Sequence, residues 1–461
     1  MRSKFSFPLR FRVRLLHLVG VLSLTLFTSG LFGQTVTTVY DFGVHGPSYP
    51  GFPTSPWTQG RDGMLYGTLE NGCEELHGCF VRFDPSTQNL TIYYGLLKSW
   101  AGDVRSVTLG SDNYFYGTTS TELYRITLNG IHSTLLTSES VNSGFGGPPI
   151  EATDGNLYGT GDTFSRPYNY SIIIYRFTRN GVSSVIYTSD PAPWGIAGAL
   201  MQGSDGKLYV TVSGGGAKGC GTVVKVALYG GLLASHDFDC SAEGSTPSGP
   251  LTLASDGNYY GVTTAGGTYG KGTLYQLTPE FGLTTLYNFG ASPTDGIYPN
   301  GGLVQGTDGN LYGTTLTVNS PATLFQWSFA TGYRQLYVFP TLTSPGGLMQ
   351  RTNGLFYGST WTGSYAWYST HEGTIFSLDM GLGPFVALVR PHGKVGSNAQ
   401  ILGQGLIGTS SVTFNGIAAT SFNVVSDTYM IAVVPSGATT GPIVVTTPTH
   451  TLTSNRNFAV P

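Results

Sequence analysis

Apolar and polar residues alternate in many short runs along this chain, and a period of two over five to eight residues predicts β-strands rather than helices. The clearest runs follow one ten-residue stretch, best seen in residues 306–315 (GTDGNLYGTT). Asp-Gly between apolar segments is typical of a two-residue hairpin turn of type I′, with positive φ at both central residues. The Leu-Tyr-Gly-Thr-Thr that follows is typical of a strand, whose glycine would allow close approach by a neighbouring strand or sheet.

Seven copies of this stretch recur, at intervals of 50, 42, 51, 51, 52 and 45 residues. We expect a structural turn at the acid or amide of each copy: Asp62, Asp112, Asp154, Asp205, Asp256, Asp308 and Asn353. A period of about 40 to 50 residues with four strand-like segments is typical of a β-propeller blade. The sequence therefore predicts an all-β protein with a seven-bladed propeller over residues 35–382. A stacked open solenoid is the alternative.

The seventh copy lacks a fourth strand, and the chain contains a spare one. Residues 35–42 (TVTTVYDF) match the last strand of a repeat, as in residues 283–289 (LTTLYNF). We therefore expect the N-terminal strand to pair with residues 373–379 and to close the ring. Closure would remove the open sheet edges that otherwise promote aggregation.

The repeat period stops near residue 383, and residues 384–461 alternate short strands and turns. Their motifs are residues 401–403 (ILG), 412–416 (VTFNG) and 432–435 (AVVP). This tail resembles the IPT/TIG group of immunoglobulin-like domains, and the resemblance implies a small β-sandwich. It has no Cys…Trp…Cys pattern, so its core must depend on apolar packing.

The repeats themselves resemble the GloVer tandem-repeat proteins, which are exported bacterial chains with variable sorting tails. The resemblance depends on the seven copies and on the junction at residues 378–385 (LDMGLGPF). It implies a secreted or cell-surface protein and supplies no catalytic residues. No sorting signal is recognised at the end of this tail.

Residues 1–33 begin with five basic residues and no acid, and continue with a mostly apolar run. This pattern predicts a cleaved secretory signal peptide, with an uncleaved membrane anchor as the alternative. Removing the segment lowers the formal net charge from −3 to about −8. Nucleic acid and anionic membrane surfaces are therefore poor partners, because binding to them needs a basic surface. We expect no membrane insertion after cleavage, and a monomer.

Four cysteines in an exported chain indicate disulfides. Cys73 and Cys79 flank a loop in the first repeat, and Cys220 and Cys240 lie at the ends of a hairpin in the fourth. A turn centred near residues 229–231 would place Cys220 opposite Cys240, at a separation that a disulfide allows. A metal site of Cys73 and Cys79 with His77 and Glu74 is the alternative, although its spacing matches no zinc template.

Candidate catalytic chemistry is sparse. Each turn supplies one carboxylate, whereas a calcium loop alternates several oxygen ligands, so a structural turn is favoured over a calcium site. Single acids such as Asp103, Glu151, Asp190 and Glu243 could line one face, but a glycosidase needs two carboxylates held close together. No nucleophile elbow or phosphate loop is recognised. We therefore predict no catalytic, cofactor-binding or metal-binding residues.

Tryptophans between the predicted strands suggest a binding function, because an indole ring can stack on a sugar or pack on a protein. The candidates are Trp57, Trp100, Trp194, Trp361 and Trp367. The alternative for each is burial within its own blade. Three functions are consistent with the sequence: a non-catalytic binding or adhesion protein for extracellular carbohydrate or protein, which is favoured, a polysaccharide hydrolase or lyase, and a structural surface component.

Overall fold

The computed structural model describes residues 34–45, 52–53, 56–73, 77–93, 104–141, 143–165, 169–189, 192–193, 197–316, 320–362 and 373–461. The predicted signal peptide lies outside these residues. The described chain is nearly all β-strand, with two four-residue helices, α1 (Phe42–His45) and α2 (Ser138–Val141). Among the described residues, no helix has the length and apolar character needed to cross a membrane.

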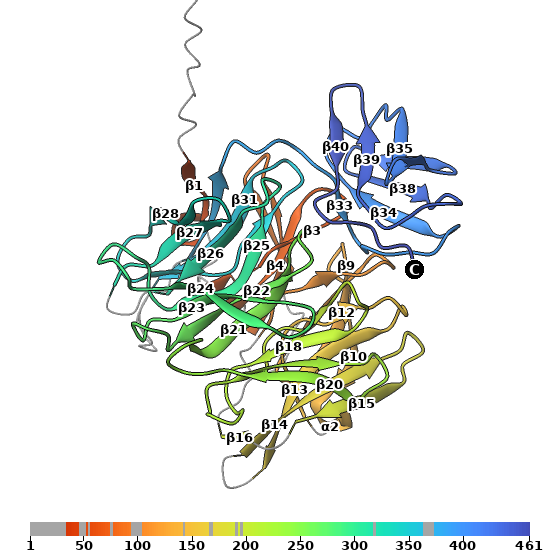
Figure 1. Ribbon diagram of the computed structural model, residues 1–461. Coiled ribbons are helices and arrows are strands. Elements are labelled where there is room, and N and C mark those ends of the chain that lie inside the picture. Colours follow the sequence, from red (N-terminus) through yellow and green to blue (C-terminus); the bar gives the residue numbers. More distant parts are fainter. Residues whose placement is uncertain are drawn as a thin grey trace, which may run out of the picture. The chain divides into compact units, whose positions relative to one another are not determined.

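Between Thr35 and Asp379 the described strands form seven antiparallel sheets, numbered 1 to 7 here by the repeat turn that each contains (Figure 1). Sheet 1 consists of β2 (Phe52–Pro53), β3 (Thr58–Gln59), β4 (Leu65–Cys73), β5 (His77–Asp84) and β6 (Asn89–Tyr93). Sheet 2 consists of β7 (Thr108–Leu109), β8 (Tyr114–Thr118), β9 (Glu122–Thr127) and β10 (His132–Thr137). Sheet 3 consists of β11 (Gly144–Phe145), β12 (Ile150–Glu151), β13 (Leu157–Ser165), β14 (Asn169–Phe177), β15 (Ser183–Thr188) and β16 (Ala192–Pro193).

The next three sheets each contain four strands that follow one another in sequence. Sheet 4 consists of β17 (Met201–Gln202), β18 (Leu208–Val212), β19 (Thr222–Val226) and β20 (Leu232–Asp237). Sheet 5 consists of β21 (Ser245–Leu253), β22 (Tyr259–Ala265), β23 (Thr273–Leu277) and β24 (Leu283–Asn288). Sheet 6 consists of β25 (Pro299–Gln305), β26 (Leu311–Thr315), β27 (Thr323–Ser328) and β28 (Gly332–Val338).

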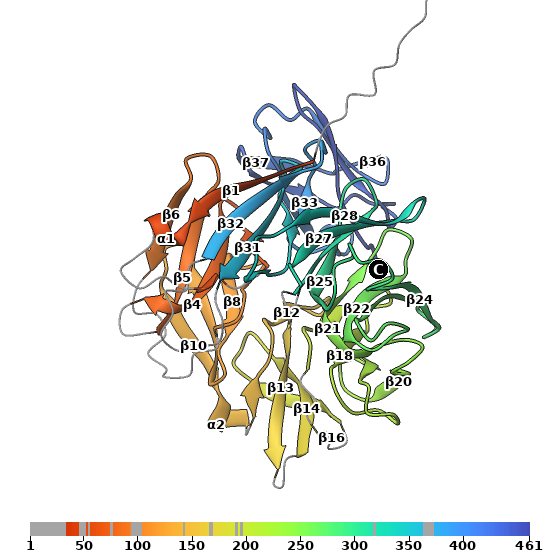
Figure 2. The ribbon, with the colours of Figure 1, turned by 90° about the vertical axis from the view of Figure 1, so that its left-hand side faces the viewer.

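Sheet 7 is completed by the N-terminal strand, as predicted. It consists of β29 (Thr343–Pro345), β30 (Met349–Gln350), β31 (Phe356–Thr362), β32 (Gly373–Asp379) and β1 (Thr35–Asp41). β1 pairs antiparallel with β32, with Thr35 facing Asp379 and Asp41 facing Thr374 (Figure 2). β2 of sheet 1 also contacts β31 and β32, so the succession of sheets returns to its starting point.

Large apolar side chains fill the spaces between consecutive sheets. Between sheets 1 and 2, 4 and 5, and 6 and 7, the repeat tyrosine lies against a ring of the next sheet, with centroids 4.4 Å apart for Tyr66 and Phe115, Tyr209 and Tyr259, and Tyr312 and Phe356. The apolar clusters therefore combine residues of two sheets, as where Phe80 of sheet 1 packs with Tyr124 of sheet 2. Burying large rings in this way supplies much of the hydrophobic stabilisation of a fold with small sheets.

The glycine after the repeat tyrosine makes room for a ring of the adjacent strand in the same sheet. A Cβ atom on Gly117 would lie 2.4 Å from the hydroxyl of Tyr124, and one on Gly313 would lie 2.5 Å from the ring of Phe325. No real Cβ contact is that short, so these positions require glycine unless the ring moves. The close approach expected at these glycines therefore comes from a neighbouring strand.

Two further antiparallel sheets follow residue 386 and enclose a separate core. One consists of β33 (Ala387–Leu388), β34 (Asn398–Leu402), β38 (Tyr429–Val433) and β37 (Phe422–Ser426). The other consists of β36 (Ile417–Ala418), β35 (Ser411–Phe414), β39 (Ile443–Thr446) and β40 (Thr451–Thr453). Phe414 and Phe458 meet edge to face in this core, which has no disulfide among the described residues.

Candidate functional site

Each of the seven sheets has two distinct ends. The repeat turn lies at one end of the sheet, which we call the turn end. In sheets 1 to 6 the hairpin that joins the third strand of the repeat to the fourth lies at the same end. The connection between the two middle strands and the crossing to the next sheet lie at the other, which we call the loop end. Antiparallel pairing fixes this division, because successive connections alternate between the two ends of a sheet.

The repeat turns have a different geometry from the one predicted. In each copy only the residue after the acid or amide has positive φ, such as Gly63 at 78° and Asn113 at 72°. The N–H of Gly63 donates to the carbonyl of Gly60, and the N–H of Gly60 donates to that of Met64. This is a three-residue loop, a type I turn followed by a left-handed residue, so the two-residue type I′ prediction was wrong.

The aspartate explains this choice of turn. One carboxylate oxygen accepts the N–H two residues further on, over 3.0 to 3.4 Å in the six aspartate copies. The other accepts the hydroxyl of the repeat tyrosine four residues on, over 2.6 to 3.0 Å. A right-handed conformation at the aspartate lets one side chain make both contacts. The repeated carboxylates are thus used in structural bonds.

Burial and, with it, the neighbouring carboxylate raise the pKa of all six of these tyrosines. The phenols therefore remain protonated donors at neutral pH. Across the sheet each tyrosine faces one residue of the third strand, which is basic in sheets 1 to 4 and glutamine in sheets 5 and 6. These partners are Arg82, Arg125, Arg176, Lys225, Gln276 and Gln326.

A second repeated contact joins neighbouring sheets at the turn end. The Gln three residues before the turn Asp or Asn accepts the N–H of a Thr or Ser in the preceding sheet and donates to its hydroxyl, as Gln202 does with Thr153. Gln305 does the same with Ser255, and Gln350 with Thr307. Gln59 and Thr352 make this contact between sheets 1 and 7. We call these pairs inter-sheet latches; they were not predicted from the sequence.

Glu151 occupies the latch position of sheet 3 and extends it into a charged cluster. Its carboxylate accepts from the N–H and hydroxyl of Ser111 and pairs with Arg179 over 2.7 Å and with Arg390 over 3.3 Å. Arg179 also pairs with Asp112. Arg390 belongs to the tail, so its ion pair joins the tail to the turn end.

The tail makes further contacts with turn ends of sheets 1, 2 and 7. Arg61 donates to Gln400 over 2.8 Å, and Thr428 donates to the carbonyl of Arg61 over 2.7 Å. The carbonyl of Gly403 accepts from Thr352 of the ring-closing latch. Beside Arg390, burial and the neighbouring guanidinium lower the pKa of His392 to about 4, so its ring is neutral at pH 7.

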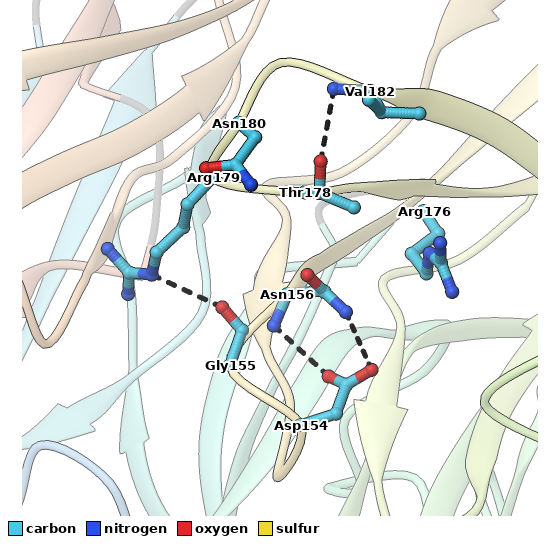
Figure 3. Close-up of a pocket in the computed structure, with 8 residues that line it drawn as sticks. All are labelled: Asp154, Gly155, Asn156, Arg176, Thr178, Arg179, Asn180 and Val182. Atoms are coloured by element: carbon cyan, nitrogen blue, oxygen red, sulfur yellow. Dashed lines mark hydrogen bonds between the residues drawn. The ribbon is translucent and has the colours of Figure 1, made fainter.

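A cavity of about 510 Å³ opens at the turn end of sheet 3 (Figure 3). Its walls come from the repeat turn and from the hairpin between β14 and β15. The lining residues are Asp154, Gly155, Asn156, Arg176, Thr178, Arg179, Asn180 and Val182. Asp154 accepts from the main-chain N–H and the side-chain amide of Asn156.

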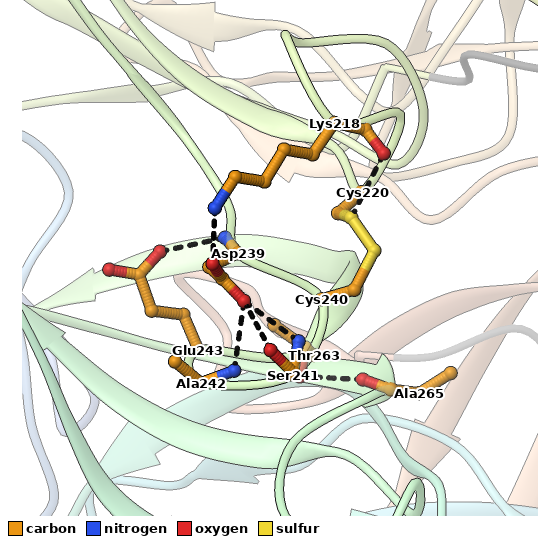
Figure 4. The surroundings of a disulfide bond; sticks show 9 residues. All are labelled: Lys218, Cys220, Asp239, Cys240, Ser241, Ala242, Glu243, Thr263 and Ala265. Carbon is orange, nitrogen blue, oxygen red and sulfur yellow. Dashed lines mark hydrogen bonds and ion pairs between the residues drawn. A yellow bond between two sulfur atoms is a disulfide. The ribbon is translucent and has the colours of Figure 1, made fainter.

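The predicted disulfide between Cys220 and Cys240 is confirmed, with a Cα–Cα distance of 5.4 Å (Figure 4). Both cysteines lie beyond the paired residues of β19 and β20. The hairpin register is one residue away from the predicted pairing, since Val223 faces His236 and a β-bulge follows Lys225. Cys79 is also disulfide-bonded, while the side chain of Cys73 lies outside the described residues.

The loops around this disulfide form a continuous surface at the loop end of sheets 4 to 6. We call residues 213–221, 239–246, 265–272 and 289–298 the loop platform. The N–H of Gly267 donates to the carbonyl of Cys240, and that of Tyr298 donates to Lys271. The ammonium group of Lys271 donates to the hydroxyl of Tyr298 over 2.7 Å, while the side chain of Tyr269 is 50% exposed.

Asp239 anchors the first turn of this platform. Its carboxylate pairs with Lys218 and accepts from the hydroxyl of Ser241 and the N–H groups of Ser241 and Ala242. These donors, the Lys218 ammonium first, hold the pKa of Asp239 well below its usual range. Glu243 accepts from the N–H of Asp239 and contacts His236, so its carboxylate also serves the loop.

The predicted tryptophans have no common location. Trp57 is 2% exposed and packs against Phe83 and Gly67, so its predicted stacking on a ligand is wrong. Its ring takes the space that the repeat glycine Gly67 leaves. Trp361 is half-buried in β31. Trp100, Trp194 and Trp367 lie outside the described residues.

Two other acids named from the sequence, Asp103 and Asp190, also lie outside the described residues, as does Glu74 of the alternative metal site. Within the described part of the chain, no three His, Cys, Asp or Glu side chains gather where they could hold a metal ion. Glu151 and Glu243 lie at opposite ends of different sheets and do not form a carboxylate pair.

The fold and the repeated turn cluster define an all-β, propeller-like repeat protein. Streptogramin B lyase has a similar fold, with a TM-score of 0.54 at 14% identity over 75% of this chain and 97% of that one. PorZ, a surface component of the type-IX secretion system of Porphyromonas gingivalis, has a TM-score of 0.47 at 13% identity over 90% of this chain and 60% of that one. A gluconolactonase from Xanthomonas campestris has a TM-score of 0.40 at 11% identity over 75% of this chain and 89% of that one. No curated protein matches the chain.

The family model for the Gloeobacter/Verrucomicrobia repeat matches residues 145–376, about half of the chain. The chain therefore belongs to the Gloeobacter/Verrucomicrobia repeat family. The matched residues run from sheet 3 to sheet 7 and include five of the seven repeat turns.

Proposed function

We propose that this protein is an exported, non-catalytic binding protein that recognises an extracellular carbohydrate or protein through the loop platform. Each of the seven sheets is one blade of a β-propeller, which four antiparallel strands per repeat and the ring-closing β1 support. The tail is an immunoglobulin-like domain of the IPT/TIG group. Its two four-stranded sheets around one core support that assignment.

The bonds that hold the loop platform in place are the observations that carry this proposal. Its turns are held by a disulfide, by the Asp239 carboxylate and by main-chain bonds between the loops of adjacent sheets. A preorganised surface loses little conformational entropy on binding, so more of the contact energy appears as affinity. The exposed ring of Tyr269 and the ammonium groups of Lys218 and Lys271 offer apolar and polar contacts side by side.

Export is supported by the disulfides and by the basic and apolar composition of residues 1–33. Because Trp57 is buried, we assign the expected aromatic contact to the exposed Tyr269 instead. The immunoglobulin-like tail bonds to turn ends, which lie at the opposite end of the sheets from the loop platform.

The test is a screen of glycans and surface proteins with the purified protein, with reducing-end release measured in the same wells. We expect binding without release, weakened about tenfold or more by Tyr269→Ala. The matched control is Phe329→Ala, which removes a similarly exposed ring from the turn end of sheet 6. Release of reducing ends would contradict the proposal and indicate a polysaccharide hydrolase or lyase.

A further inference from the structure

Arg176 differs from its counterparts in sheets 1, 4, 5 and 6. Where the residue two after the turn aspartate carries no amide, the third-strand cation pairs with that aspartate in sheets 1 and 4: Arg82 with Asp62 and Lys225 with Asp205. In sheet 2 that residue is Tyr114, and Arg125 lies over its ring, 4.5 Å from the centroid. Where that residue is asparagine, its amide bonds to the aspartate, and in sheets 5 and 6 the third-strand residue is the neutral Gln276 or Gln326.

Sheet 3 combines the asparagine with a cation. Asn156 donates its side-chain amide to Asp154 over 2.8 Å, and Tyr158 donates to the same oxygen. Arg176 forms no ion pair within the described chain, and its Nε is buried without a hydrogen-bond partner. A buried N–H without an acceptor is unfavourable, so this Nε is expected to have a partner under working conditions.

The Arg176 guanidinium lines the 510 Å³ cavity, a volume in the range of small-ligand sites (Figure 3). Asn156, Thr178 and Asn180 add neutral polar groups to its walls. Just beyond the lining, the ring of Tyr229 from sheet 4 lies 5.7 Å from Arg176 and is 73% exposed. Arg179 also faces the cavity, but Asp112 and Glu151 neutralise it.

We infer that this cavity binds an acidic sugar residue, a uronate, through its carboxylate. Guanidinium and carboxylate form the strong, geometrically specific pair that the unpartnered Arg176 lacks. The amide and hydroxyl groups of Asn156, Thr178 and Asn180 suit sugar hydroxyls, and the exposed face of Tyr229 suits the apolar side of a pyranose ring. The site lies at the turn end, so it is separate from the loop platform and adds a second ligand contact.

The experiment measures binding of an α-1,4-linked galacturonic acid trisaccharide by titration calorimetry, with its methyl ester as the uncharged match. Arg176→Gln is the test variant, and Gln276 and Gln326 show that this repeat position accepts glutamine. Arg125→Gln is the control, because Arg125 holds the same position in sheet 2, also has an unpartnered Nε, and does not line the cavity. We expect Arg176→Gln and methyl esterification each to weaken binding about tenfold or more, and Arg125→Gln to leave it unchanged.

Several results would overturn the inference: no binding of the trisaccharide, equal binding of its methyl ester, no effect of Arg176→Gln, or an equal loss with Arg125→Gln. A tri-glutamate peptide that binds as tightly would reassign the site to acidic peptides. Loss of trisaccharide binding in Tyr269→Ala, with Arg176→Gln unaffected, would move the acidic sugar to the loop platform. That last result would overturn the inference and leave the proposed function standing.

Discussion

The two ends of the sheets are stabilised by different kinds of contact. At the turn end, six copies repeat one arrangement in which an aspartate bonds to its own loop and to the repeat tyrosine. At the loop end, sheet 4 uses a disulfide and the Asp239 carboxylate, while sheet 5 uses Lys271 and Tyr298. Repetition at the turn end defines the fold, whereas variation, at the loop end and at Arg176 in sheet 3, leaves side chains available to bind a ligand.

The largest expected effect on stability is at the loop end. Replacing both Cys220 and Cys240 by serine should lower the free energy of unfolding by about 3 kcal/mol, because the bridge closes a loop of about 20 residues. Guanidinium denaturation of the variant and of the wild type measures the difference. Wild type in reducing buffer is the control; it also loses the Cys79 bridge, so it should be at least as destabilised as the variant. A loss below about 1 kcal/mol would show that hydrogen bonds alone hold this loop.

The ring-closing latch should have the next largest effect. Gln59→Ala leaves the buried N–H of Thr352 without its acceptor and should cost about 2 kcal/mol. Gln202→Ala breaks the same contact to the exposed Thr153 and should cost less than about 1 kcal/mol, since water can replace the lost partner. Denaturation midpoints of the two variants give the comparison. Equal losses would refute a special role for ring closure.

Acid should weaken the turn end. Burial raises the pKa of Asp205, but the bonds from Lys225, the Lys207 N–H and Tyr209 outweigh it, so the folded-state pKa lies below its usual value. The stabilisation is complete above the unfolded pKa of about 3.9 and is lost as pH falls through the folded pKa. Asp205→Asn should therefore reduce the fall in melting temperature between about pH 5 and pH 3. An unchanged slope would assign the acid sensitivity elsewhere.

Tyr269→Ala should have the smallest effect on stability, within about 0.5 kcal/mol, because half of the side chain is already exposed. Its effect on ligand binding should nonetheless exceed that of any turn-end aspartate variant. Thermal unfolding and the binding screen measure the two quantities on one sample. A destabilisation above about 1 kcal/mol would show that Tyr269 supports the platform itself.

Periodicity in the sequence was sufficient to predict an all-β repeat protein of antiparallel sheets. The spacing of the copies predicted where the repeat turns lie, and the unpaired TVTTVYDF segment predicted the pairing of β1 with β32. The turn type was wrong because Asp-Gly suits two hairpin geometries, and the deciding contact is the reach of Asp62 to Tyr66. That tyrosine recurs four residues after each aspartate, so the pairing was visible in the repeat.

Side-chain sites were less accessible to prediction. Gln59, Gln202, Gln305 and Gln350 recur at one repeat position, which is a signal that could have revealed the latches. Burial of Trp57 depends on the space above Gly67, a packing detail that local sequence does not specify. Arg176 has no ion pair with Asp154 because the side-chain amide of Asn156 bonds to that carboxylate instead. The sequence contains both candidate partners, and only the folded geometry decides between them.

The pairing of β1 with β32 also sets the order in which the protein can assemble. β1 is among the first strands to leave the ribosome, and its partner follows more than 300 residues later. Closing so long a loop is slow compared with forming hairpins inside a sheet, so sheet 7 is expected to be the last to form. Until then β1 is an unpaired edge strand. Truncation at either end of the repeats would therefore remove one partner of this pair and leave sheet 7 incomplete.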